Sequence, residues 1–83
     1  MRQDLDTETL GELFARTRRP LFSYAAAVLL DRAAAEDVVQ RTFEVAIARR
    51  HAFRPGLGSA EAWLYLASVQ LLARRLARSG YHS

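Results

Sequence analysis

The 83-residue chain contains no cysteine and no lysine, and it has only two histidines. Without cysteine it can form neither a disulfide framework nor a thiolate metal site, which fits a reducing compartment. Two histidines, His51 and His82, are too few for the usual metal sites or nucleophilic triads. No apolar run approaches the roughly 18 residues of a membrane-spanning helix, and the acidic N-terminal stretch does not resemble a signal peptide. We therefore expect a soluble, cytoplasmic protein that uses no metal, cofactor or membrane.

Motifs for catalysis and nucleotide binding are also missing. Glu36 and Asp37 are adjacent, so on a helix their carboxylates point about 100° apart, a poor arrangement for cooperating acid and base groups. The segment PGLGS, residues 55–59, predicts a loop and not a nucleotide-binding turn, because no strand precedes it and no lysine follows. The sequence therefore predicts that the protein is not an enzyme.

What the chain does contain is arginine, which supplies all 12 basic residues and leaves a net charge of +3. The planar guanidinium group binds phosphates and base edges and stacks on rings, so an arginine-only surface suits nucleic acid. GC-rich coding is the alternative explanation of the same bias. The charge is thus compatible with a polyanionic partner but does not require one.

The apolar pattern predicts an all-α fold, because no strand-like alternation persists anywhere in the chain. A chain of this length forms one domain with a thin core. We expect a compact bundle of three helices, or of four if Pro20 divides the first one, in a single domain over residues 1–83. The helices are expected at about 7–30, kinked or broken at Pro20, at 32–50 and at 59–78.

Capping residues mark where these helices begin. Thr9 with Glu12 has the form of a capping box for the first helix, and Asp6 is an alternative start. Asp31 and Ser59 are the expected N-caps of the second and third helices, because a short polar side chain there accepts a hydrogen bond from the first turn.

The second helix is predicted to have two different faces. The apolar face comprises Val38, Val39, Thr42, Phe43, Val45 and Ala46. The opposite face is a polar stripe of Asp37, Gln40, Arg41 and Glu44. A stripe of this kind is usually a solvated surface, and that interpretation stays open beside a functional one.

The third helix is predicted to be apolar on two sides. One face comprises Ala60, Trp63, Leu64, Ala67 and Leu71, and the other comprises Tyr65, Leu66, Val69, Leu72, Ala73 and Leu76. Narrow polar seams, Ser68 with Arg75 and Gln70 with Arg74, separate them. Such a helix is either sandwiched inside the domain or offers one side to another molecule.

Rings, an amide and guanidinium groups also accumulate on the last loop and the third helix. They are Phe53, Arg54, Trp63, Tyr65, Gln70, Arg74, Arg75 and Arg78. Single-stranded DNA is held by this combination, because bases stack on rings while arginines neutralise the backbone. Trp63 has an alternative interpretation as a core residue, and Tyr65 points to another side of the helix, so the two rings do not serve one surface.

Residues 31–67, DRAAAEDVVQRTFEVAIARRHAFRPGLGSAEAWLYLA, closely resemble region 2 of bacterial sigma factors of the extracytoplasmic-function (ECF) family. The preceding segment RRPLFSYAAAVLL, residues 18–30, fits the same domain. Two signatures carry the resemblance. One is a helix with the pattern AEDVVQ-TF. The other is a turn that begins at Phe53 and Arg54 and continues through the loop and Ser59 to AWLY. Both occur at the separation typical of the family.

The resemblance implies a transcription initiation domain that binds the β′ clamp helices of RNA polymerase and recognises the melted minus-ten element of the promoter. It implies a polymerase-binding surface of Asp37, Val38, Gln40, Arg41 and Glu44. With the rings and arginines above, it implies a DNA-binding set of Phe53, Arg54, Gly56, Ser59, Trp63, Gln70, Arg74 and Arg78. The loop would hold a flipped-out base, since glycine lets the backbone approach it and the helix behind Ser59 offers free N–H groups.

The sequence departs from the family pattern at several of these positions. A glutamate is usual where this chain has Arg41, and an aspartate is usual where it has Arg74. Two positions that are usually polar are Leu66 and Val69, and Gln70 stands where asparagine is usual. The alternative function is therefore a sigma-like interaction module. It would bind polymerase, an anti-sigma factor or a sigma partner through the apolar third-helix face, without reading DNA.

Family members also carry a second domain, region 4, that reads the minus-35 element. We therefore expect this chain to be either a fragment or a stand-alone domain that works with a separate region 4 partner.

Overall fold

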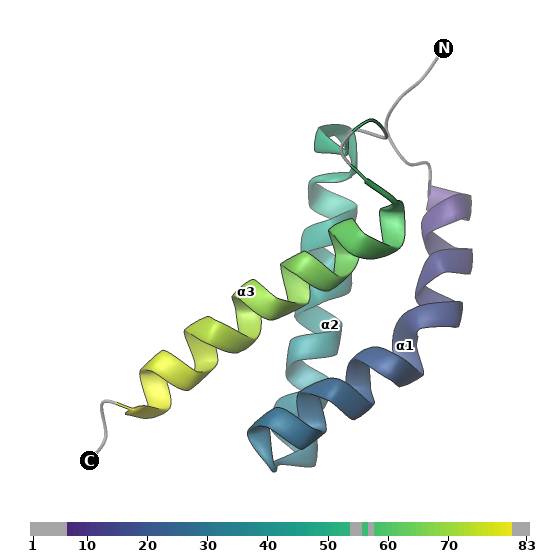
Figure 1. Ribbon diagram of the computed structural model, residues 1–83. Helices are drawn as coiled ribbons and strands as arrows, with labels where there is room; N and C mark the ends of the chain where they lie inside the picture. The colour runs from purple at the N-terminus through teal and green to yellow at the C-terminus, as the bar shows by residue number, and fades with distance from the viewer. Residues whose placement is uncertain (1–6, 54–55, 57, 81–83) are drawn as a thin grey trace.

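The computed structural model describes residues 7–53, 56 and 58–80, and most of them are helical. Helix α1 spans Thr7–Leu29, α2 spans Arg32–Ala48, the short 3-10 helix η1 spans Arg50–Ala52, and α3 spans Ala60–Gly80. Figure 1 shows α3 crossing α2, with its C-terminal half diverging from the other helices. No strand occurs in the described ranges. The predicted all-α bundle is confirmed.

Helix α1 continues through Pro20, and Figure 1 shows it bending along its length. Proline removes one N–H donor and its ring crowds the carbonyl four residues earlier, which bends a helix. Leu13 and Leu21 are buried on either side of Pro20, so both halves of α1 face the same core. Because α1 begins at Thr7, the capping box predicted at Thr9 is wrong, and the alternative start at Asp6 lies outside the described residues.

The two other predicted N-caps are confirmed. Asp31 has an extended backbone, with φ of −154° and ψ of 111°, and its Oδ1 accepts a hydrogen bond from the amide of Ala34 at 3.1 Å. The Oγ of Ser59 accepts one from the amide of Ala62, also at 3.1 Å. Each bond satisfies one of the amides that a helix leaves unpaired in its first turn, so both helices begin where the sequence indicates.

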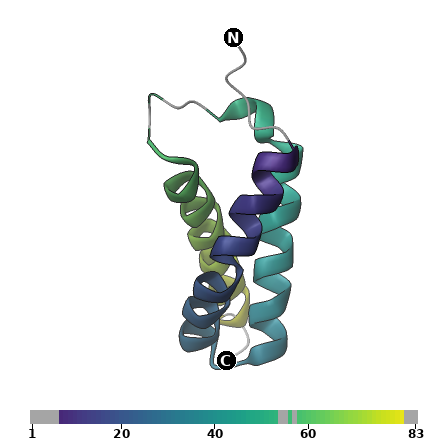
Figure 2. The same cartoon turned by 90° about the vertical axis from the view of Figure 1, so that its right-hand side faces the viewer.

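The core consists of two adjoining clusters. The first takes residues from all three helices: Leu10, Leu13, Leu21, Val39, Phe43, Ala46 and Leu64. Phe14 covers it, with its ring stacked on that of Phe43 at a centroid distance of 4.1 Å. The second cluster, Ala25, Ala35, Val38 and Leu72, has small side chains where α1 meets α2. Small residues let two helices approach closely, and Figure 2 shows α1 and α2 side by side.

Each helix also buries one hydroxyl group. Thr17, Thr42 and Ser68 donate, at 2.7 Å in every case, to the carbonyls of Leu13, Val38 and Tyr65 on their own helices. The buried hydroxyls are thereby satisfied without a partner on another helix. This explains why Ser68, which the sequence placed in a polar seam, packs inside the bundle.

The two apolar faces of α3 have different environments. The face that includes Leu64 packs inward, and Leu64 itself has no exposed surface. On the other face Leu72 is buried, but Leu66, Val69 and Leu76 remain 57%, 44% and 45% exposed. One apolar side of α3 therefore holds the bundle together, while much of the other has no covering element among the described residues.

We predict that Leu64→Ala lowers the free energy of unfolding by about 2–5 kcal/mol, because it opens a cavity where the three helices meet. Leu66→Ala, two residues further along the same helix, is the matched control and should change it by less than about 0.5 kcal/mol. Urea titration followed by circular dichroism measures both. Equal losses for the two variants would contradict the position given to Leu64.

Candidate functional site

The predicted polymerase-binding residues line one side of a groove between α2 and the C-terminal half of α3. From α2 come Asp37, Val38, Gln40, Arg41 and Glu44, and from α3 come Leu71, Arg74, Arg75, Ala77 and Arg78. The groove has a volume of about 790 Å³. All five residues implied by the resemblance are thus gathered at one place, and α3 supplies a second wall that the sequence analysis did not anticipate.

The period of α2 determines which of these side chains reach the surface. Asp37, Gln40, Arg41 and Glu44 are exposed, as predicted from the spacing. Val38 is different, because it is only 4% exposed and packs in the second core cluster. Val38 therefore contributes to the floor of the groove, which agrees with its place on the predicted apolar face of the second helix, and its part in polymerase binding stays a prediction.

A tertiary ion pair joins the two walls of the groove. The Nη1 of Arg75 donates to the Oδ2 of Asp37 at 3.1 Å, while the Asp37 side chain remains 73% exposed. Along α2, the Nε2 of Gln40 donates to the Oε2 of Glu44 at 3.4 Å. Exposed pairs of this kind add at most about 1 kcal/mol to stability. Their main consequence is that two carboxylates of the groove already have partners within the chain.

A smaller hollow lies where the last loop enters α3. It is lined by Ala52, Phe53, Gly58, Ser59, Ala62, Trp63 and Leu66 and has a volume of about 230 Å³. Phe53 is only 7% exposed, and its ring meets that of Trp63 at a centroid distance of 5.6 Å and an angle of 59°. Phe53 thus packs against Trp63 in the wall of the hollow, and it is not the free stacking ring that the sequence suggested.

The glycines of the loop differ in conformation. Gly58 has a φ of 142°, a backbone angle that residues with a side chain rarely adopt, whereas Gly56 has no positive φ. An added Cβ at Gly56 would meet no described atom within 4 Å, so the packing of the described residues does not require glycine there. Arg54, another predicted DNA-binding residue, lies outside the described residues.

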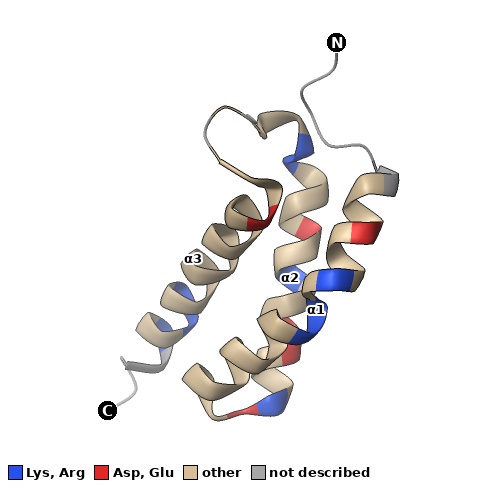
Figure 3. Cartoon of the chain, turned by 45° about the vertical axis from the view of Figure 1, so that its right-hand side comes forward, with Lys and Arg blue, Asp and Glu red and all other residues tan. Residues whose placement is uncertain are grey.

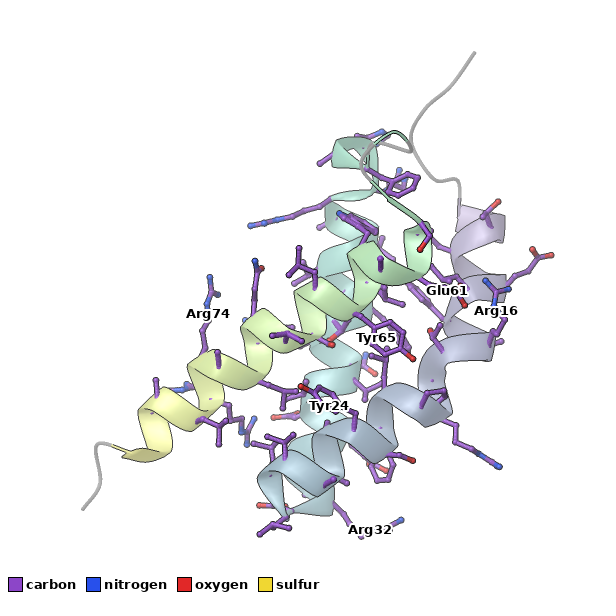
Figure 4. The ribbon with its side chains drawn as sticks, viewed as in Figure 1. Arg16, Tyr24, Arg32, Glu61, Tyr65 and Arg74 are labelled. Carbon is purple, nitrogen blue, oxygen red and sulfur yellow. The ribbon has the colours of Figure 1, made fainter. Side chains whose placement is uncertain are left out.

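The structure divides the predicted DNA-binding set between two places. Phe53, Ser59 and Trp63 line the hollow, whereas Arg74 and Arg78 line the α2/α3 groove. Arg74 follows Trp63 by eleven positions, which corresponds to about 16.5 Å along the helix axis. Figure 4 shows Arg74 extending from α3 on the side away from α1. Gln70 is exposed but lines neither site.

Two further side chains of α3, Glu61 and Tyr65, lie on the side of this helix that faces α1. Figure 4 shows Glu61 beside Arg16 of α1, and the Nε of Arg16 donates to the Oε2 of Glu61 at 3.2 Å. Tyr65, like Trp63, is half-buried against the first core cluster, but only Trp63 lines the hollow, which agrees with the prediction that the two rings do not serve one surface.

Sequence reasoning did not single out a third hollow, between α1 and α2. Arg18, Arg19 and Arg32 line it, and the guanidinium of Arg32 lies 5.3 Å from the ring centroid of Phe22. The three arginines at positions 16, 18 and 19 were the available signal. Across the described ranges, no three metal-ligating side chains gather. In the same ranges, no helix is both long enough and apolar enough to span a membrane.

Comparison with known proteins gives one match. Residues 13–81 match the family model described as Sigma-70 region 2, which covers most of the chain. Searches of curated proteins and of solved structures find no match.

We predict that Ser59→Ala lowers the free energy of unfolding by about 1 kcal/mol, because the amide of Ala62 loses its acceptor at the start of α3. Ser59→Asn should retain most of the stability, since asparagine is an equivalent cap. The control is Ser23→Ala, an exposed position inside α1, where alanine should be neutral or slightly stabilising. Thermal unfolding of the three variants would contradict this assignment if Ser59→Ala were as stable as wild type.

Proposed function

The chain belongs to the sigma-70 region 2 family, whose domains bind RNA polymerase and act in promoter melting, and on this premise we propose its specific role. It is a promoter-recognition domain of ECF type that binds the β′ clamp helices of polymerase through α2. At the hollow beside α3 it captures one base of the melted minus-ten strand.

The observation that carries this proposal is the exposed polar stripe on α2. Asp37, Gln40, Arg41 and Glu44 occupy the positions that the resemblance assigns to polymerase binding, and all four side chains lie at the surface in one groove. A merely solvated face would also be polar and exposed. The coincidence of family position, exposure and a shared concave surface favours a contact with another protein.

The shape of the hollow supports the part of the proposal that concerns DNA. Trp63 is half-buried, so part of its ring is available beside Ser59 and the first turn of α3. A flipped base can stack on such a ring, while the helix N-terminus favours nearby negative charge.

A specific observation also favours the alternative function, an interaction module that does not read DNA. Leu66, Val69 and Leu76 form an exposed apolar strip on α3, and DNA would favour polar or basic side chains there. If the chain binds polymerase but shows no preference for minus-ten strands, it is such an interaction module. Its further partner would then be an anti-sigma factor or a separate region 4.

For polymerase binding, we predict that combining Asp37→Ala with Gln40→Ala weakens the affinity for bacterial RNA polymerase core by about tenfold, or about 1.4 kcal/mol. Both side chains are exposed, so the fold should be retained. Glu12→Ala combined with Ser23→Ala, two exposed positions on α1 outside the groove, is the matched control. If both double variants bind core polymerase like wild type in a titration, the stripe is only a solvated face.

For promoter recognition, we predict weak, salt-dependent binding to a single strand that carries a minus-ten-like sequence, and weaker binding to the same sequence as a duplex. The slope of log affinity against log salt should be about −0.7 per neutralised phosphate. Trp63→Leu should cost about 1–3 kcal/mol by loss of stacking, whereas Ser23→Ala should cost nothing. Fluorescence anisotropy with labelled strands measures this. Equal affinity for single strand and duplex would contradict base capture.

A further inference from the structure

The groove between α2 and α3 has an excess of positive charge. Its walls carry four arginines, Arg41, Arg74, Arg75 and Arg78, against two carboxylates, Asp37 and Glu44. Figure 3 shows basic residues along the C-terminal half of α3, while an acidic residue lies at its start. The groove is therefore a local concentration of cations on a domain whose net charge is only +3.

Most of this excess is not neutralised by other residues in the described part of the chain. Asp37 accepts a hydrogen bond from Arg75, and Glu44 accepts one from Gln40. Among the described residues, the other three arginines of the groove, Arg41, Arg74 and Arg78, form no ion pair. They stand on both walls, so an anionic ligand in the groove could contact α2 and α3 at once.

The spacing of these arginines makes them unfavourable for the isolated helix. Arg74 and Arg78 are four residues apart on one face of α3, and like charges at that spacing repel. Their position near the C-terminal end of the helix offsets part of this cost through the helix dipole. A carboxylate between them would remove the repulsion, since an arginine fork binds a carboxylate through two parallel hydrogen bonds.

Other residues of the groove indicate a protein ligand rather than a nucleic acid. The floor is apolar, with the buried Val38 and the half-buried Leu71, and Ala77 continues it along α3. A phosphate backbone laid along the α2 wall would bring negative charge at a regular spacing past Asp37 and Glu44, whereas a helix can carry its carboxylates only where they face the arginines. An amphipathic helix satisfies all of these features, because its apolar ridge covers the floor while carboxylates on its flanks reach the arginines.

We propose that the α2/α3 groove is a docking site for an acidic amphipathic helix of a protein partner, with carboxylates that pair with Arg41 on one wall and with Arg74 and Arg78 on the other. The proposal rests on the proposed function in that it places partner binding on α2. It goes further in adding α3 as the second wall and in specifying the charge of the partner. It also assigns Arg74 and Arg78 to this protein contact instead of to DNA.

The test uses the full chain, labelled with nitrogen-15, and two synthetic helical peptides. One peptide has leucines along one side and glutamates on both flanks, and the other has lysine in place of every glutamate. We expect the glutamate peptide to bind and to shift the amide signals of α2 and α3 that line the groove. The lysine peptide should bind at least about tenfold more weakly, because it faces uncompensated arginines.

Charge reversal supplies the matched variants. Arg41→Glu combined with Arg74→Glu should weaken binding of the glutamate peptide and strengthen that of the lysine peptide. Arg18→Glu combined with Arg19→Glu makes the same change in net charge at the α1/α2 hollow and should leave both affinities close to wild type. Circular dichroism confirms that each variant folds.

Several results would overturn the proposal: no binding of the glutamate peptide, equal binding of both peptides, or the same loss in the Arg18 and Arg19 variant. If single-stranded DNA shifted the amide signals of the groove as much as the glutamate peptide does, the groove would be a nucleic-acid site instead.

None of these measurements uses polymerase. A failure of the proposed function, seen as no affinity for core polymerase, therefore remains distinguishable from a failure of this inference.

Discussion

The packing of Leu64 against α1 and α2 is the contact on which both candidate sites depend. Its side chain is fully buried in the cluster that joins the three helices. Helix α3 forms one wall of the groove and one side of the hollow, so its position sets the shape of both. Surface residues such as Arg75 and Glu61 add weak ion pairs to α2 and α1, but the buried leucine holds α3 in place.

A bundle of this size cannot cover every apolar surface that it contains. A small domain has a high ratio of surface to volume, and three helices leave each one with a side facing solvent. On α2 that side is polar, whereas on α3 it includes Leu66 and Val69. The same limit leaves room for the groove, because α3 diverges from α2 toward its C-terminus, as Figure 1 shows, and no fourth helix fills the space in the described part of the chain.

Features that depend on neighbouring residues could be predicted from the sequence. The caps at Asp31 and Ser59 and the polar stripe on α2 follow from local hydrogen bonding and from the helical period. Features that depend on tertiary packing could not be predicted in this way. Phe53 is buried, with its ring against that of Trp63, and Arg75 pairs with Asp37, 38 residues away, only because α3 crosses α2.

Because α3 is one uninterrupted helix, it fixes the angular offset between the hollow at its start and the arginines near its end. Each residue inserted between them would rotate one site by about 100° relative to the other and move it about 1.5 Å along the axis. Even four added residues would leave a rotation of about 40° and a displacement of about 6 Å. Exposed side chains in this stretch, such as that of Gln70, can vary, but its length cannot change without separating the two surfaces.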